Sequence, residues 1–299
     1  MALTAIAPIT WGSTYLVTRA LLPADAPLWG AVLRALPAGL LLLLVARERP
    51  RGAWWWRAPL IGTMTVGAFF VLVYVVAQRL PSGLAATMMA VSPAVMMLLA
   101  WPMLALRPQR MPLIGAASGF VGVCAMLLTG VTGTDPVGVL ASLAAMTMAS
   151  AGFMLARRWS AEVSVLSATA WQLVAGGLVV LPFAVAVEGA PPHLDGPAVA
   201  GLAYLTTVAT ALAYVVWFGG LARLEPGTVG LLGLLNPVAG VVLGATLAGE
   251  RFGLLQFLGM VLVLVGIALG HPTPARSGAE LPQASPSVLG PASARRTGG

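Results

Sequence analysis

The sequence predicts an all-α membrane protein with ten transmembrane helices, arranged as two inverted five-helix repeats. Three observations predict this fold class. Of the 299 residues, 59% are hydrophobic and 8% are charged, whereas soluble proteins carry about 25% charged residues. The apolar residues form ten runs of roughly 20 residues each, the length that crosses a bilayer as a helix. The two halves of the chain also match each other when one is shifted along the other.

The ten apolar runs are continuous and are separated by short connections rich in proline, glycine, aspartate and arginine. Continuous runs of this length predict helices, whereas a transmembrane β-strand alternates in polarity over about ten residues. The first run follows no basic segment and precedes no clear cleavage site, so we interpret it as a retained span. In chain order the runs cover residues 3–20, 28–46, 59–78, 83–106, 112–130, 137–156, 167–187, 198–221, 228–248 and 252–270.

The connections between the runs are too short to hold a separate soluble domain. We therefore divide the chain into a first five-helix repeat, residues 1–133, and a second, residues 134–270. After this point the composition changes to proline, serine, alanine and glycine, with almost no apolar side chains to bury. Residues 271–299 are expected to form a disordered cytoplasmic tail.

The two halves resemble each other at equivalent distances from the ends of their runs. A shift of 144 residues aligns the third to fifth runs with the eighth to tenth, and a shift of 138 places Gly39 over Gly177. Because each half has an odd number of runs, the second half crosses the membrane in the opposite sense. Secondary transporters use such inverted repeats and bind substrate between them. The pairs matched by the longer shift include Arg79 with Arg223, Gly83 with Gly227, Pro93 with Pro237, Arg107 with Arg251, Gly115 with Gly259, and Gly122 with Gly266.

The distribution of arginine predicts the orientation of the chain. Loops that follow odd-numbered runs hold two arginines, Arg79 and Arg251, with Arg19 at the edge of the first run. Short loops rich in positive charge stay in the cytoplasm, so both termini are expected there and the protein is expected in the plasma membrane. Loops that follow even-numbered runs hold nine arginines: Arg47, Arg49, Arg51, Arg57, Arg107, Arg110, Arg157, Arg158 and Arg223.

Composition excludes several other classes of protein. All 16 basic residues are arginine, and they lie singly or in short clusters between apolar runs, which disfavours a nucleic-acid-binding face. Cys124 is the single cysteine, and His193 and His271 are isolated in loops, so neither a metal site nor any cofactor is expected. An enzyme would need clustered histidine or acidic residues near one membrane face. We therefore expect no enzyme.

Short motifs along the chain resemble those of the EamA-type transporters in the drug/metabolite transporter superfamily. The resemblance covers about residues 3–270 and implies a ten-helix, basket-like carrier with cytoplasmic termini, often an exporter of amino acids or related metabolites. One departure concerns Glu250, whose aligned position in the first half is Leu106. The small four-helix members of the superfamily also have a buried glutamate in their first helix, and this chain has no acid there. The motifs are Trp11-Gly12-Ser13-Thr14-Tyr15 running to Arg19, Arg34, Thr169-Ala170-Trp171-Gln172 with Gly176-Gly177, Thr210 to Tyr214 through Trp217, Asn236-Pro237, and Gly249-Glu250.

The polar and aromatic residues within the runs are the candidates for a substrate cavity. An ionisable residue in a membrane span is a functional hypothesis by default, while aromatic rings with one polar atom suit a partly hydrated cavity. Paired prolines at equivalent places in the two halves point to a transport site. Each residue also has a structural alternative: an arginine strut, an aromatic interface anchor or a fixed kink. The candidates are Trp11, Tyr15, Arg34, Tyr74, Ser92, Pro93, Trp171, Gln172, Tyr214, Trp217, Asn236 and Pro237.

Every acidic residue falls in a loop, at the edge of a run or in the tail. Proton coupling usually needs a group that titrates within the pathway, and arginine does not serve. We therefore expect facilitated diffusion, exchange, or coupling through the charge of the substrate itself. Glu250, at the non-cytoplasmic end of the ninth run, is the one candidate for carrying protons.

Together these observations predict transmembrane transport of a small organic metabolite by alternating access, without a chemical step. The expected partners are the substrate and the lipid bilayer, and the chain is expected to act as a monomer or a homodimer. A drug or cationic-compound exporter is the alternative within transport. A membrane scaffold that transports nothing is the alternative from another class.

Overall fold

The computed structural model describes residues 1–80, 89, 92–127, 135–247 and 253–269. All regular secondary structure in these residues is helical. Glu250 and the expected tail, residues 271–299, lie outside them. Among the described residues, five helical segments are long and apolar enough to cross a membrane, and each overlaps one expected run. These segments are Pro27–Ala46, Trp54–Arg79, Pro136–Arg158, Val165–Glu188 and Gly196–Arg223.

Shorter helices accompany the five long segments in both halves of the chain. The first half contains α1 (Ala2–Gly12), α2 (Thr14–Leu21), α3 (Pro27–Ala46), α4 (Trp54–Gly62), η1 (Thr63–Gly67), α5 (Ala68–Arg79), α7 (Ser92–Leu104) and α8 (Arg110–Leu127). The second half contains α9 (Pro136–Arg158), α10 (Val165–Phe183), η2 (Ala184–Glu188), α11 (Gly196–Thr206), η3 (Thr207–Leu212), α12 (Ala213–Arg223), α13 (Pro226–Leu232), α14 (Leu235–Leu247) and α15 (Leu254–Leu269).

Several of the expected helices are interrupted near their middles. α1 and α2 meet at Ser13, whose hydroxyl donates to the carbonyl of Thr10 at 2.7 Å. In the π-helical turn η1, the hydroxyl of Thr65 donates to the carbonyl of Ile61 at 2.8 Å. Such bonds compete with the backbone's own hydrogen bonds and loosen the helix locally. A further break separates α13 from α14 at Gly233.

Two helices from different halves, α3 and α10, pack closely in opposite directions. A β-carbon on Gly39 would lie 2.7 Å from the backbone nitrogen of Val174, and one on Gly177 would lie 2.6 Å from the side chain of Leu36. The earlier residue of α3 thus meets the later residue of α10, which is an antiparallel crossing. A shift of 138 residues relates Leu36 to Val174 and Gly39 to Gly177. Exchanging the two halves therefore turns one contact into the other, so the crossing is symmetric.

The pair α8 and α15 repeats this arrangement. A β-carbon on Gly122 would lie 2.6 Å from the carbonyl oxygen of Gly259, and one on Gly266 would lie 2.5 Å from that of Gly115. These contacts are also antiparallel. The shift of 144 residues relates Gly115 to Gly259 and Gly122 to Gly266, so exchanging the two halves turns one contact into the other. Small residues at these points let the two backbones approach closely, as is common in membrane helix pairs.

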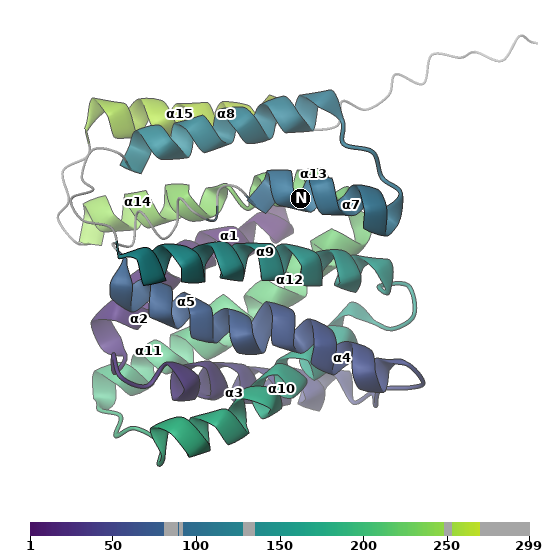
Figure 1. The fold of residues 1–299 in the computed structure, drawn as a ribbon, viewed down its shortest axis with the longest axis vertical. Helices are drawn as coiled ribbons and strands as arrows, with labels where there is room; N and C mark the ends of the chain where they lie inside the picture. The colour runs from purple at the N-terminus through teal and green to yellow at the C-terminus, as the bar shows by residue number, and fades with distance from the viewer. Residues whose placement is uncertain (81–88, 90–91, 128–134, 248–252, 270–299) are drawn as a thin grey trace, which may run out of the picture.

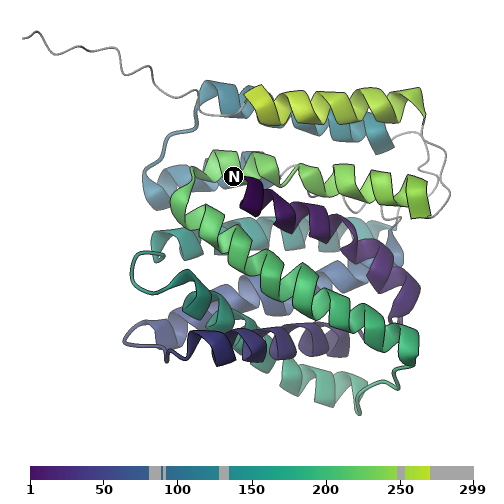
Figure 2. The same cartoon turned by 180° about the vertical axis from the view of Figure 1, so that it is seen from behind.

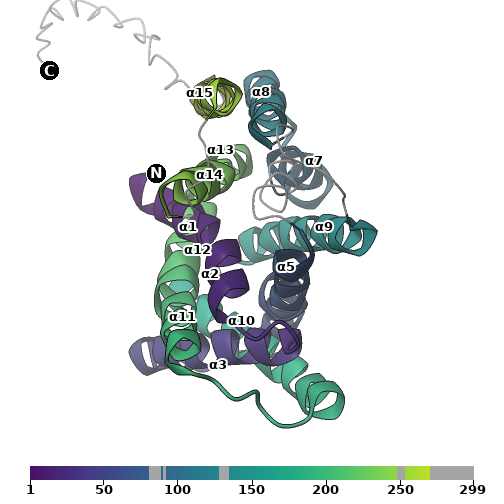
Figure 3. The same cartoon turned by 90° about the vertical axis from the view of Figure 1, so that its left-hand side faces the viewer.

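The two antiparallel pairs lie at opposite ends of the molecule. Figures 1 and 2 show α3 and α10 at one end, α8 and α15 at the other, and the remaining helices stacked between them. Figure 3 looks along most of the helices, and α1, α12, α9 and α5 surround the middle of the molecule in this view.

Polar contacts join the two halves at the helix ends. Glu188, at the end of η2, accepts hydrogen bonds from the backbone nitrogens of Leu28 (2.7 Å) and Trp29 (2.9 Å) at the start of α3. Its carboxylate therefore caps a helix whose own preceding residue supplies no side-chain cap. Asp135 caps α9 and pairs with Arg79 of α5 at 3.0 Å. The Arg79 side chain, aided by the backbone N–H groups that Asp135 caps, holds the pKa of the Asp135 carboxyl below its usual value.

Candidate functional site

A cavity lies in the middle of the molecule and is lined by helices from both halves. The space between its lining side chains, counted together with the open solvent at its mouth, is about 710 Å³. The first half contributes side chains from α1, α2, α3, α5 and α7, and the second contributes α9, α12, α14 and the break between α13 and α14.

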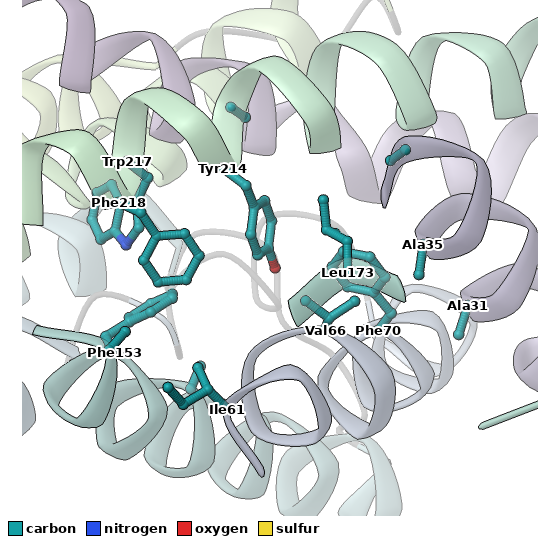
Figure 4. Close-up of a cluster of buried hydrophobic side chains, with 14 of the residues drawn as sticks. Ala31, Ala35, Ile61, Val66, Phe70, Phe153, Leu173, Tyr214, Trp217 and Phe218 are labelled. Atoms are coloured by element: carbon teal, nitrogen blue, oxygen red, sulfur yellow. The ribbon is translucent and has the colours of Figure 1, made fainter. Parts of the chain in front are cut away.

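Aromatic rings form one wall of this cavity. Trp11 of α1 packs against Tyr214 and Trp217 of α12, with ring centres 5.5 and 5.0 Å apart. Phe153 of α9 lies 5.6 Å from the Trp217 ring and 5.8 Å from the Phe218 ring. Figure 4 shows Tyr214 and Phe218 projecting from the same helix, with Phe153 facing them. Such a wall can hold the apolar part of a small molecule.

Arg34 of α3 supplies a positive charge to the cavity, although its residue is only 6% exposed. Its Nε donates to the hydroxyl of Thr210 at 2.6 Å, and its Nη2 donates to the carbonyl of Ala209 at 3.1 Å. The guanidinium carbon lies 4.1 Å from the centre of the Phe70 ring. These contacts fix the direction of the side chain, but every partner is neutral.

Within the part of the chain that the structure describes, Arg34 has no carboxylate partner. The two ion pairs found there join Arg57 to Glu162 and Arg79 to Asp135, at the ends of helices. The same residues contain no cluster of three histidine, cysteine or acidic side chains that could hold a metal ion. The chemistry of the cavity is therefore that of a fixed cation among aromatic and neutral polar groups.

Backbone carbonyls of two of the π-helical turns, η1 and η3, accept hydrogen bonds from cavity side chains. The hydroxyl of Tyr214 donates to the carbonyl of Thr65 in η1 at 2.6 Å, and Nε1 of Trp11 donates to the carbonyl of Ala209 in η3 at 3.0 Å. Residues 65 and 209 are separated by the 144 residues of the sequence repeat. Each half thus presents one equivalent carbonyl to the cavity region, as π-helical turns near functional sites commonly do.

Three buried polar atoms of the cavity lining have no hydrogen-bond partner among the described residues. They are Oγ1 of Thr14, Nε1 of Trp217 and Oδ1 of Asn236. Most buried polar groups in proteins are hydrogen-bonded, so each unpaired group calls for an explanation. A polar group that reached these atoms from the cavity would supply the missing partners.

Seven of the twelve residues expected in a cavity come together around this one, although they are spread over more than 220 positions of the sequence. Their side chains come from α1, α2, α3, α7, α12 and α14. They are Trp11, Tyr15, Arg34, Ser92, Tyr214, Trp217 and Asn236.

The other five expected residues lie elsewhere. The hydroxyl of Tyr74 donates to the carbonyl of Pro23, and Tyr74 borders a smaller pocket beside α11. Trp171 donates from Nε1 to the carbonyl of Glu48 at 2.8 Å and does not line the cavity. Pro93 packs against Gly230 of α13. Gln172 and Pro237 are buried, and Gln172 lines a different pocket between α10 and α12. Glu250 lies outside the described residues.

Sequence reasoning missed an entire face of α9. Met146, Ala149, Ser150 and Phe153 all line the cavity. Their spacing of three, four and seven residues places them on one side of a helix. A serine and an aromatic residue on one stripe of an apolar helix were the available signal, but nothing in the sequence shows which helix faces lie inside the bundle.

Comparisons with known proteins agree with this architecture. Residues 1–128 and 136–270 each match the model of a family described as the EamA-like transporter family. Protein PecM of Dickeya dadantii is 35% identical over 266 residues, which cover 88% of this chain and 89% of that protein. A probable amino-acid metabolite efflux pump of Salmonella typhimurium is 29% identical over 282 residues, covering 87% and 90% of the two chains.

Further likenesses concern the membrane location and the fold. An uncharacterized inner membrane transporter of Escherichia coli, YedA, is 26% identical over 268 residues, covering 87% of each chain. One solved crystal structure superimposes with a TM-score of 0.75 at 17% identity, covering 90% of this chain and 96% of the other. At that identity the structural match bears on the fold alone.

Proposed function

The chain belongs to the EamA-like transporter family, and from this premise we propose that it moves a small organic metabolite across the plasma membrane by alternating access. We infer that the substrate is an amino acid or a related compound and that net movement is export. The relative named as a probable amino-acid metabolite efflux pump supports this inference. As a member of a transporter family, the protein is not an enzyme.

One observation carries the proposal: broken helices of both halves meet at the central cavity. Trp11 and Thr14 flank the break between α1 and α2, and Gly233 lies at the break between α13 and α14. Transporters bind their substrates where discontinuous helices of two repeats meet near the middle of the membrane. Interrupted backbone within a membrane is tolerated where it is buried in protein or lines a cavity.

We further propose that ten spans form two inverted five-helix repeats, residues 1–133 and 134–270. The antiparallel crossings of α3 with α10 and of α8 with α15 support this arrangement, because equivalent helices of two inverted repeats run in opposite directions. The two separate family matches support it as well. Rocking of one repeat against the other would open the cavity to each side in turn, with hinges near Pro93 and Pro237.

The nine arginines of the even-numbered loops support a cytoplasmic position for both termini. For coupling, we propose that no carboxylate in the pathway carries protons, since the described cavity lining contains no acidic residue. In liposomes an imposed pH gradient is then expected not to drive uphill movement. Uphill movement that is lost in Glu250→Gln would contradict this mode of coupling.

A binding screen followed by a flux assay tests the proposed function. Purified protein would be screened for thermal stabilisation by amino acids, and each stabilising compound would then be measured by counterflow in liposomes. We expect counterflow above that of protein-free liposomes, a strong reduction in Asn236→Ala, and no change in Val187→Ala, which alters an exposed side chain. A flat result across amino acids, sugars, nucleosides and cationic drugs would favour a scaffold instead.

A further inference from the structure

The charge of Arg34 has no counter-ion among the described residues, and a buried unpaired cation is energetically costly inside a membrane protein. We propose that Arg34 binds the carboxylate of the transported compound, so that the cavity selects organic acids and zwitterions over cations. This inference rests on the proposed function and specifies the substrate class of the same site.

The geometry of the guanidinium leaves a binding position open. Nε and Nη2 are directed to Thr210 and Ala209, whereas Nη1 makes no hydrogen bond with a described residue. Arginine presents its donors in a rigid planar fork, so the two protein contacts also fix where Nη1 points. The side chain borders the cavity, and a carboxylate there would supply the missing negative charge.

A purely structural role does not explain why a charge stands at this position. The shift of 138 residues that relates α3 to α10 makes Gln172 the residue equivalent to Arg34. The crossing of α3 with α10 is symmetric, yet α3 carries the guanidinium of Arg34 where α10 carries the neutral amide of Gln172. The crossing of α3 with α10 therefore does not require the charge of Arg34, whose own contacts, to Thr210, Ala209 and Phe70, are all with neutral groups.

The rest of the lining suits a molecule with an acidic end and an apolar body. Rings of Trp11, Phe153 and Trp217 form an apolar wall. The unpaired Oδ1 of Asn236 and Oγ1 of Thr14 can accept hydrogen bonds from an ammonium or amide group. The described lining offers no carboxylate to hold a compound whose only charge is positive.

Three matched probes test the inference directly: phenylacetate, phenylacetamide and phenethylamine, titrated by calorimetry into the full chain in lipid nanodiscs. They share an aromatic ring and differ in the charge of the group beyond it. We expect phenylacetate to bind roughly 10- to 100-fold more tightly than phenylacetamide, the range for a hydrogen bond to a charged group. Phenethylamine is expected to bind most weakly. Equal or tighter binding of the amide or the amine would overturn the proposal.

Substitutions of Arg34 test whether this side chain causes the preference for the acid over the amide. Arg34→Gln introduces the residue found in the other half and is expected to bring the affinity ratio of acid to amide close to one. Arg34→Lys is expected to keep part of the preference, since it retains the charge without the fork. Arg157→Gln is the matched control: Arg157 donates to backbone carbonyls, including that of Leu224 at 2.6 Å, away from the cavity, so the ratio should not change. Because a ratio is independent of the folded fraction, an unchanged ratio in Arg34→Gln overturns the proposal.

Counterflow separates this inference from the proposed function. Flux of a carboxylate compound at equal rates in wild type and Arg34→Gln would overturn the carboxylate site and leave transport standing. Carboxylate binding that depends on Arg34, without flux of any compound, would support the site and contradict transport.

Discussion

At the scale of single residues, side chains of the cavity region donate to backbone carbonyls in helical turns that have lost regular hydrogen bonding. The bond from Tyr214 to the carbonyl of Thr65 crosses between the two halves of the chain. Tyr214→Phe would leave that carbonyl buried without a side-chain donor, and we expect a loss of about 1–3 kcal/mol in the free energy of unfolding. Thermal unfolding in detergent would show it as a lower melting temperature.

Tyr204 provides the control for this prediction. Its hydroxyl lies 2.7 Å from that of Ser13, which also donates to the carbonyl of Thr10. Tyr204→Phe therefore leaves Ser13 with a partner and should cost less than Tyr214→Phe. A melting temperature for Tyr214→Phe at or above that of Tyr204→Phe would show that the bond to Thr65 contributes little.

The ion pair of Asp135 with Arg79 gives a prediction with a defined pH dependence. The folded-state pKa of Asp135 is lowered, chiefly by the Arg79 side chain, so its contribution to stability is present above the unfolded pKa of about 3.9. The contribution is lost as pH falls through the folded pKa. Asp135→Asn keeps a capping side chain at the start of α9 and removes the charge.

We therefore expect Asp135→Asn to lower the melting temperature at pH 7 and to match wild type once the pH falls well below about 4. Arg79→Gln should show the same convergence, because it removes the other member of the pair. A difference from wild type that stays constant from pH 7 down to acid would contradict the electrostatic explanation.

At the scale of helices, glycine contacts decide how closely the two halves approach. A β-carbon on Gly176 of α10 would lie 2.5 Å from the carbonyl oxygen of Gly62 and 3.0 Å from the backbone nitrogen of Gly67. Backbone atoms cannot move aside as side chains can, so Gly176→Ala should push α10 away from α4 and η1. We expect a loss of about 1–3 kcal/mol, the usual cost of overpacking, measured by thermal unfolding.

Gly219 of α12 is the matched control, since a β-carbon there would meet no atom within 4 Å. Gly219→Ala should stabilise the helix by roughly 0.5–1 kcal/mol through backbone entropy. The opposite signs of the two substitutions are the expected result. Stabilisation by Gly176→Ala would show that α10 and α4 are less closely packed than described.

The helices were predictable from sequence to different degrees. The five long segments overlap expected runs because a continuous apolar run has one stable form in a bilayer, a hydrogen-bonded helix. The breaks at Ser13, η1 and η3 were not predicted. Hydroxyl side chains such as Thr65 allow a local π-helical turn, but packing of the neighbouring helices decides whether one forms. The face that α9 turns to the cavity was missed for the same reason.

At the scale of the whole molecule, orientation in the membrane follows from the charges of the loops. In a Cys124→Ala background, single cysteines would be placed at Arg49, in the connection after the second run, and at His193, in the connection after the seventh, both exposed. We expect an impermeant thiol reagent added to intact cells to label His193→Cys and not Arg49→Cys. Labelling of Arg49→Cys alone from outside would reverse the assigned orientation, and labelling of both would contradict the odd number of membrane spans expected between them.

The sequence by itself determined the class of the protein, because sparse charge, apolar runs and the internal repeat leave a helical membrane protein as the stable solution. It also supplied many of the side chains that line the cavity, because polar and aromatic residues are conspicuous in apolar runs. Only the tertiary structure decided which of them meet. Tyr74 and Trp171 were candidates beside Tyr214 and Trp217, yet they contact Pro23 and Glu48 and do not line the cavity, because the rotation of each helix is set by packing against its neighbours. That no described carboxylate pairs with Arg34 is likewise a property of the assembled bundle, since the sequence shows which charges exist but not which of them are close enough to pair.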